Sequence, residues 1–193
     1  MGNVTVVNNV TLDGVMQSPG RPDEDTRGGF THGGWGADYQ DEVIARQMGQ
    51  RMAAAKGSLL LGRRTYEDFH AVWPNRTDNP FTGHLNRVTK YVASRTLSEP
   101  LPWQNSILLE GDAGDAVERL KQHDAGDLTI LGSGNLLETL IRRDLIDQYV
   151  LLTFPLVLGT GRRLFPEGKS LPLRLVDSLA SPSGIVLATY VPA

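Results

Sequence analysis

Cysteine is absent from the sequence, and this absence excludes disulfides, thiolate zinc sites, iron–sulfur clusters and a cysteine nucleophile. A long apolar run is also missing, because no window approaches the roughly 18 apolar residues of a membrane-spanning helix. The N-terminal stretch MGNVTVVNNV has no basic region followed by a long apolar run, so we expect no signal peptide. These absences predict a cytoplasmic protein that does not use a membrane as a partner.

An excess of basic residues is lacking as well. The chain holds 19 lysines and arginines against 22 aspartates and glutamates, which gives a net charge of −3. A general nucleic-acid binder carries a basic excess, so we expect no nucleic-acid partner. The four histidines are scattered without the spacing of metal ligands, which predicts that the protein has no metal site.

Apolar spacing predicts strands that alternate with helices up to about residue 145, followed by a strand-rich C-terminal part. Two of the predicted helices start with a capping pair, Thr65 with Asp68 and Asn135 with Glu138. This order predicts one α/β domain over residues 1–193, with a mostly parallel central sheet flanked by helices and antiparallel C-terminal strands. We expect a first strand ending near Asn8, further strands near 58–62, 88–94, 106–110, 127–132, 147–159, 172–178 and 184–191, helices near 41–55, 65–73, 112–122 and 135–145, and a polar loop over 74–86.

Residues 18–37 form a glycine-rich segment that is too long for a simple connector. It holds six glycines and two prolines, and unstructured segments of this length are usually functional lids or disordered. Trp35 lies in this segment and has two interpretations. Its ring stacks on a planar substrate, or it ties the loop to the body of the protein.

Four polar or glycine-rich segments follow predicted strands: TLDG at 11–14, GRRT at 62–65, SRT at 94–96 and GSGN at 132–135. In an open α/β sheet, ligands bind outside the carboxyl ends of the strands. We therefore expect these segments to line one rim and to form the binding site.

The GRRT segment suits an anion. A helix N-terminus offers free backbone N–H groups and a partial positive charge, and Gly62 lets the backbone approach a ligand closely. Arg63 and Arg64 supply forked donors for phosphate. Ser94 and Arg95 repeat this pattern after the next strand. The alternative is that both segments are polar turns with solvated arginines.

Two further segments carry candidate residues. The turn at 132–135 is glycine-rich and suits pyrophosphate, but it matches neither GxGxxG nor the P-loop pattern, and its alternative is a tight turn with a good cap. Asp13 is a candidate proton relay or substrate ligand, or else the first residue of a DG turn. The segment LGTGRRLF at 158–165 has two interpretations. The first is a β-bulge or a bend of the chain, and the second is a contact with an anion.

The motifs TLDG, LLLGRRTYEDF, VASRTL, LGSGNLLETLIRRDLID and FPLVLGTGRRLF together resemble the dihydrofolate reductase-like superfamily over nearly the whole chain. The closer likeness is to the stand-alone relatives of the RibD C-terminal reductase domain. The resemblance implies NADPH as cofactor, an enzyme, and a homodimer. For the phosphates of NADPH, it implies binding by Gly62, Arg63, Arg64 and Thr65, with Arg63 at the 2′-phosphate. It places Ser94 and Arg95 by the adenosine. The pyrophosphate near the nicotinamide would be held by Gly132, Ser133, Gly134, Asn135 and Leu136.

The chain also departs from the pattern of this superfamily. Without cysteine it cannot carry the zinc deaminase to which riboflavin-pathway reductases are often fused, and its turn reads G-S-G instead of G-G-G. Dihydrofolate reductases place an acid on the helix after the first strand; Asp38 and Asp41 are the candidates here, in competition with Asp13. The resemblance implies hydride transfer to a pteridine- or pyrimidine-like heterocycle. The alternatives are 5-amino-6-(5-phosphoribosylamino)uracil reductase and an NADP-binding module without turnover.

Overall fold

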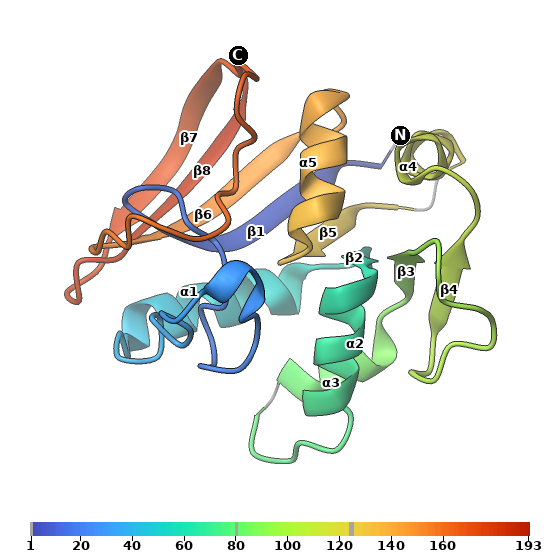
Figure 1. Cartoon of the computed structure of the whole chain (residues 1–193), viewed down its shortest axis with the longest axis horizontal. Helices are drawn as coiled ribbons and strands as arrows, with labels where there is room; N and C mark the ends of the chain where they lie inside the picture. Colours follow the sequence, from blue (N-terminus) through green and yellow to red (C-terminus); the bar gives the residue numbers. More distant parts are fainter. Residues whose placement is uncertain (1, 80, 124–125) are drawn as a thin grey trace.

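A computed structural model describes residues 2–79, 81–123 and 126–193 of the chain. Within this part, eight strands form one sheet in the order β4-β3-β2-β5-β1-β6-β8-β7 (Figure 1). The strands are β1 (Val4–Thr11), β2 (Ser58–Gly62), β3 (Lys90–Ala93), β4 (Ser106–Leu109), β5 (Leu128–Leu131), β6 (Gln148–Phe154), β7 (Leu173–Ala180) and β8 (Val186–Pro192). The helices are α1 (Glu42–Ala54), α2 (Arg63–Val72), α3 (Phe81–Arg87), α4 (Ala113–Gln122), α5 (Gly134–Arg142) and a short 3₁₀ turn, η1 (Arg27–Gly29).

Strands β1 to β6 all pair in parallel, and only the C-terminal part of the sheet is antiparallel. β1 lies at the centre between β5 and β6, while β8 pairs antiparallel with both β6 and β7. This arrangement confirms the predicted fold class. Because the parallel strands run in one direction, β2, β3, β4 and β5 all end at the same edge of the sheet.

Both faces of the central sheet are buried, as expected for parallel strands that helices cover on each side. In β1, Val4 and Val6 pack with Leu137 and Leu140 of α5 on one face. Val7 points to the other face, toward the cluster that includes Ile44 of α1. This alternation has the period of two that strands impose on their side chains.

The structure corrects the predicted starts of two helices. α2 begins at Arg63 with Gly62 as its N-cap, so Thr65 does not cap it. α5 begins at Gly134 with Ser133 as its N-cap, so Asn135 does not cap it either. Thr65 instead accepts a hydrogen bond from the Ser133 N–H across the two turns, a long-range contact that local sequence patterns do not reveal.

Three other elements differ from the expectation. β6 ends at Phe154, although the sequence predicts a strand as far as 159. β1 continues past Asn8 to Thr11, because its second half pairs with β6 as far as Phe154. The expected polar loop over 74–86 contains α3, which begins where Asn79 Oδ1 accepts the Phe81 N–H at 2.9 Å. Packing of the buried Leu85 stabilises this short helix, and no local propensity signals it.

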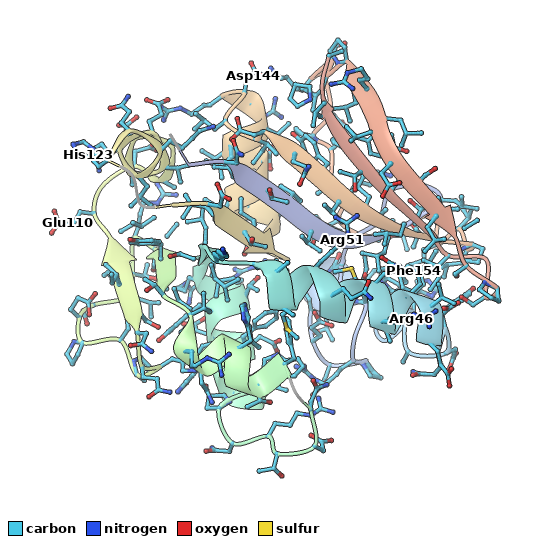
Figure 2. The ribbon with its side chains drawn as sticks, turned by 180° about the vertical axis from the view of Figure 1, so that it is seen from behind. Arg46, Arg51, Glu110, His123, Asp144 and Phe154 are labelled. Atoms are coloured by element: carbon cyan, nitrogen blue, oxygen red, sulfur yellow. The ribbon has the colours of Figure 1, made fainter. Side chains whose placement is uncertain are left out.

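The glycine-rich segment 18–37 is tied to the body of the protein at its second half. Trp35 is buried, its Nε1–H donates to the Gln17 carbonyl at 2.7 Å, and its ring meets Phe154 edge-on with centroids 5.2 Å apart. Figure 2 shows Phe154 beside α1, which carries Arg46 and Arg51. Trp35 therefore has the position of an anchor, the second of its two predicted interpretations.

Candidate functional site

A cleft of about 1000 Å³ lies where the parallel strands end. Its walls are the segments 62–65, 93–96 and 131–136, together with residues 16–21 and 23–27 from the loop after β1. The cleft therefore brings together every residue that the family resemblance assigns to the cofactor: Gly62, Arg63, Arg64, Thr65, Ser94, Arg95, Gly132, Ser133, Gly134, Asn135 and Leu136.

The two main turns of the cleft are hydrogen-bonded to each other. The Gly62 N–H donates to Ser133 Oγ at 3.0 Å, and the Ser133 N–H donates to Thr65 Oγ1 at 2.9 Å. Ser133 has a left-handed backbone with φ of 61°, which turns both its N–H and its hydroxyl toward α2. The buried Asn8 of β1 holds the same turn through the Gly132 N–H at 2.9 Å. These contacts fix the spacing between the starts of α2 and α5.

Within residues 2–79, 81–123 and 126–193, neither of these helices has a side-chain cap, and no side chain of this part accepts a hydrogen bond from the first N–H groups of α2 or α5. By contrast, Asp112 caps α4 by accepting from the Gly114 N–H at 2.9 Å. Uncapped N–H groups and the positive helix end attract anions, so the starts of α2 and α5 suit phosphate oxygens.

Three arginines of the cleft differ in their partners. Arg63 lies 3.3 Å from Glu67 on the surface of α2. Arg64 and Arg95 are exposed, and neither has an ion-pair partner in the described ranges 2–79, 81–123 and 126–193. A surface ion pair such as that of Arg63 contributes little, so all three guanidinium groups can reorient toward a phosphate.

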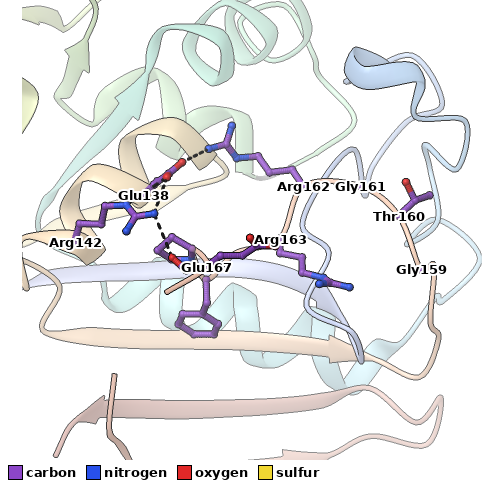
Figure 3. A pocket seen from close by; sticks show the side chains of 10 residues that line it. Glu138, Arg142, Gly159, Thr160, Gly161, Arg162, Arg163 and Glu167 are labelled. Carbon is purple, nitrogen blue, oxygen red and sulfur yellow. Dashed lines mark hydrogen bonds and ion pairs between the residues drawn. The ribbon is translucent and has the colours of Figure 1, made fainter. Parts of the chain in front are cut away.

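Arg162 also lines this cleft, and it comes from the segment 158–165. It also lines a second hollow of about 690 Å³ between α5 and the loop 159–167, where its guanidinium contacts Glu138 at 3.2 Å (Figure 3). A Cβ on Gly134 would lie 2.5 Å from Arg162 Nε, so a larger residue there would require the Arg162 side chain to move. The segment itself bends at 159–161, which is the first of its two predicted interpretations, and the anion contact stays a prediction.

Asp13 lies outside the set of residues that line the cleft, and its position argues against the predicted catalytic role. Its carboxylate accepts hydrogen bonds from Thr11 Oγ1 at 2.5 Å, Leu158 N at 3.2 Å and Gly159 N at 2.8 Å. The Thr11 hydroxyl, and after it these N–H groups, lower the pKa of Asp13. A strongly bonded carboxylate of low pKa is a poor proton donor, so Asp13 links the end of β1 to the loop after β6.

The predicted substrate residues Trp35, Asp38 and Asp41 are also absent from the lining of the cleft. Asp41 is the N-cap of α1 and accepts from the Val43 and Ile44 N–H groups. Hydrogen bonds from Ser183 and from the start of α1 hold the pKa of Asp41 well below its usual range. Asp38 is exposed. The structure thus gives none of these three residues a place beside the cofactor turns.

The sequence reasoning missed the acidic side of the cleft. Glu24 from the loop and Asp68 from α2 both line it, and Arg21 joins the loop to α2 by an ion pair with Asp68. The run DED at 23–25 was a usable signal, because it places three carboxylates in the segment expected to cover the site. The described part of the chain has no group of three or more potential metal ligands and no helix able to cross a membrane.

Comparisons with known proteins agree with this fold. The family model of the RibD C-terminal domain matches residues 3–187. An uncharacterized Bacillus subtilis protein, YyaP, is 28% identical over 138 residues, which cover 69% of this chain and 72% of that protein.

Solved structures show the same architecture. A protein from Shewanella sp. PV-4 with a provisional assignment to riboflavin biosynthesis superposes with a TM-score of 0.68 at 24% identity, over 100% of this chain and 99% of that chain. A dihydrofolate reductase from Enterococcus faecalis, solved with NADP(H), superposes with a TM-score of 0.60 at 15% identity, over 99% and 96%. At these identities the likeness establishes the dihydrofolate reductase-like fold.

Proposed function

Because this chain belongs to the RibD C-terminal domain family, we propose that it is an NADPH-dependent reductase that transfers hydride to a pteridine- or pyrimidine-like heterocycle. One observation carries the proposal. All the phosphate-directed residues that the sequence singled out lie along a single cleft at the carboxyl ends of the strands. Ligands of open α/β sheets bind at this location.

The residues of the cleft fit the charges of NADPH. The uncapped starts of α2 and α5 would hold its pyrophosphate, and Arg63 and Arg95 would hold its 2′-phosphate. When bound, NADPH supplies the hydride, and the protein supplies position and electrostatics. The bonds between Gly62, Ser133 and Thr65 would keep the two phosphate-binding turns at a constant spacing.

Part of the lining of the cleft is apolar. Phe69 of α2, Trp73 just after this helix, Phe81 of α3 and Met48 of α1 contribute to it. Aromatic and thioether side chains pack well against planar heterocycles. We propose that the substrate occupies this part and that the loop 16–27 limits the access of water to it.

A turnover screen tests the proposal. NADPH absorbance should fall in the presence of dihydrofolate or a ribosylamino-pyrimidine, and quinones serve as a comparison class. Turnover of the phosphoribosylamino-uracil alone would select the riboflavin-pathway alternative. NADPH binding without turnover of any compound would select the NADP-binding module.

We also propose a homodimer, which the family resemblance implies. β7 is one of the two edge strands of the described sheet, and Leu175 and Val176 on it are each about half exposed. A long edge strand with exposed apolar side chains pairs readily with another chain. Light scattering should give twice the chain mass of 21.1 kDa, and Val176→Lys should give a single chain mass. A wild-type mass of one chain would contradict the dimer.

A further inference from the structure

The carboxylates that line the cleft differ in whether an arginine side chain forms an ion pair with them. Six line the cleft, and five of these form an ion pair with an arginine. The five are Asp23 and Asp68 with Arg21, Asp25 with Arg27, Glu67 with Arg63, and Asp112 with Arg143. Glu24 is the sixth, and it has no ion pair within the part of the chain that the structure describes.

Glu24 is held in a fixed orientation by the backbone of its own loop. Its Oε2 accepts hydrogen bonds from the Gly20 N–H at 2.7 Å and the Arg21 N–H at 3.2 Å. Its Oε1 has no hydrogen-bond partner among residues 2–79, 81–123 and 126–193. One oxygen therefore positions the side chain, and the other is left for a proton and a ligand.

The loop that carries Glu24 is pinned over the cleft. The guanidinium of Arg21 forms its ion pair with Asp68 in the second turn of α2, next to the apolar residue Phe69. The loop that carries Glu24 is thus joined to α2, the helix whose start is proposed to hold phosphate and whose Phe69 also lines the cleft. The predicted acids Asp13, Asp38 and Asp41 do not share this position.

The surroundings of Glu24 raise the pKa of its carboxyl group. Burial is the main cause that raises the pKa of Glu24, and the nearby Asp68 carboxylate adds to it. Hydrogen bonds from the Gly20 and Arg21 N–H groups lower this pKa by less than burial raises it. The charged groups that face the Glu24 carboxyl are Asp68 from α2 and Arg21 from its own loop. The positive charge of Arg21 also lowers the pKa of Glu24. A raised carboxyl pKa is typical of general acids that work near neutral pH.

We propose that Glu24 is the proton donor of the reduction, an inference that rests on the proposed function. As hydride adds to the carbon of a C=N bond of the heterocycle, the bond electrons move to the nitrogen. The O–H bond of Glu24 breaks, and its proton forms the new N–H bond. The Glu24 carboxylate then regains a proton from water, so the net reaction consumes one NADPH and one proton and yields NADP⁺.

The first test measures the protonation of Glu24 without any turnover. Carbon-13 NMR of glutamate-labelled free protein should show one carboxyl that titrates above the ordinary glutamate pKa of about 4.3. The signal should be absent in Glu24→Gln. In Asp68→Asn it should titrate at lower pH, because the like charge is removed and Arg21 is released toward Glu24. A Glu24 carboxyl that titrates at or below the ordinary value would overturn the proposal.

The second test uses the heterocycle that the turnover screen identifies. Glu24→Gln should lower kcat about 100-fold and remove the fall in rate that wild-type protein shows as pH rises through the Glu24 pKa. The dissociation constant of NADPH should stay within about two-fold. Asp38→Asn, which changes an exposed carboxylate away from the cleft, should leave kcat and its pH profile unchanged.

The outcomes separate the two proposals. If no heterocycle is reduced by the wild type, the proposed function fails, and the role of Glu24 fails with it. If a heterocycle is reduced and Glu24→Gln retains both kcat and the pH profile, only the assignment of Glu24 is overturned. Equal losses of kcat and NADPH affinity would show that Glu24 only shapes the loop, which also overturns it.

Discussion

Arg63→Ala is expected to weaken NADPH binding about 10- to 100-fold while NADH binding changes little. A hydrogen bond to a charged group contributes roughly 1.5–3 kcal/mol net, and each 1.4 kcal/mol is about tenfold in affinity. NADH lacks the 2′-phosphate, so it does not use this contact. Arg63 must leave Glu67 to reach the phosphate, but their separation of 3.3 Å on an exposed helix surface marks a weak pair.

Dissociation constants of both cofactors at one salt concentration check this prediction, since salt screens such contacts. Arg95→Ala should act in the same direction if both guanidinium groups share the phosphate. Arg46→Ala is the matched control, because Arg46 is exposed on α1 and does not line the cleft (Figure 2). Equal weakening of NADPH and NADH by Arg63→Ala would assign the arginine to the pyrophosphate or to the fold.

Gly132→Val is expected to reduce NADPH affinity more than about 100-fold and to destabilise the fold by about 1–3 kcal/mol. Gly132 has φ of 56°, a left-handed conformation that a β-branched residue rarely adopts. A Cβ there would lie 3.1 Å from Thr65 Oγ1, the atom that accepts the Ser133 N–H. The valine would therefore push the β5–α5 turn away from the β2–α2 turn and separate the two phosphate-binding helix starts.

Gly168→Val is the matched control for this substitution. Gly168 has φ of 73°, but a Cβ there would meet no atom within 4 Å, and the residue lines neither hollow. The control variant should lose stability through backbone strain alone and should keep its affinity for NADPH. Calorimetry and thermal unfolding on both variants measure the two effects separately. Full NADPH affinity in folded Gly132→Val would contradict the account of the coupled turns.

The gathering of the segments 62–65, 94–96 and 132–136 along one cleft was predictable from the sequence, because each of them follows a strand. A strand, a glycine and a helix start fix where Gly62 and Gly132 lie relative to the sheet edge, and parallel strands bring such ends together. The same local logic failed for the helix caps. Thr65 and Ser133 bond to each other across 68 positions of sequence, and a local capping pattern carries no information about that contact.

The acidic side of the site was not predictable in the same way. Asp13 is the carboxylate nearest the end of the first strand in sequence, but its hydrogen bonds to Leu158 and Gly159 turn it into a link between two loops. The distinction of Glu24 depends on which arginines pair with the other carboxylates of the cleft. Two of these pairs join distant segments, Arg21 with Asp68 of α2 and Asp112 with Arg143 just after α5. Ion pairs between segments that are distant in the sequence form only in the folded chain, so local sequence patterns do not predict them.

The central claim is that this cleft binds NADPH through its phosphates and without a metal. Titration calorimetry of the wild-type protein with NADPH and with NADH, in the presence of a chelator, tests it most directly. We predict one NADPH bound per chain and an affinity for NADH that is at least about tenfold weaker, the value of a single charged hydrogen bond. Absence of NADPH binding, its loss on chelation, or equal affinity for the two cofactors would contradict the claim.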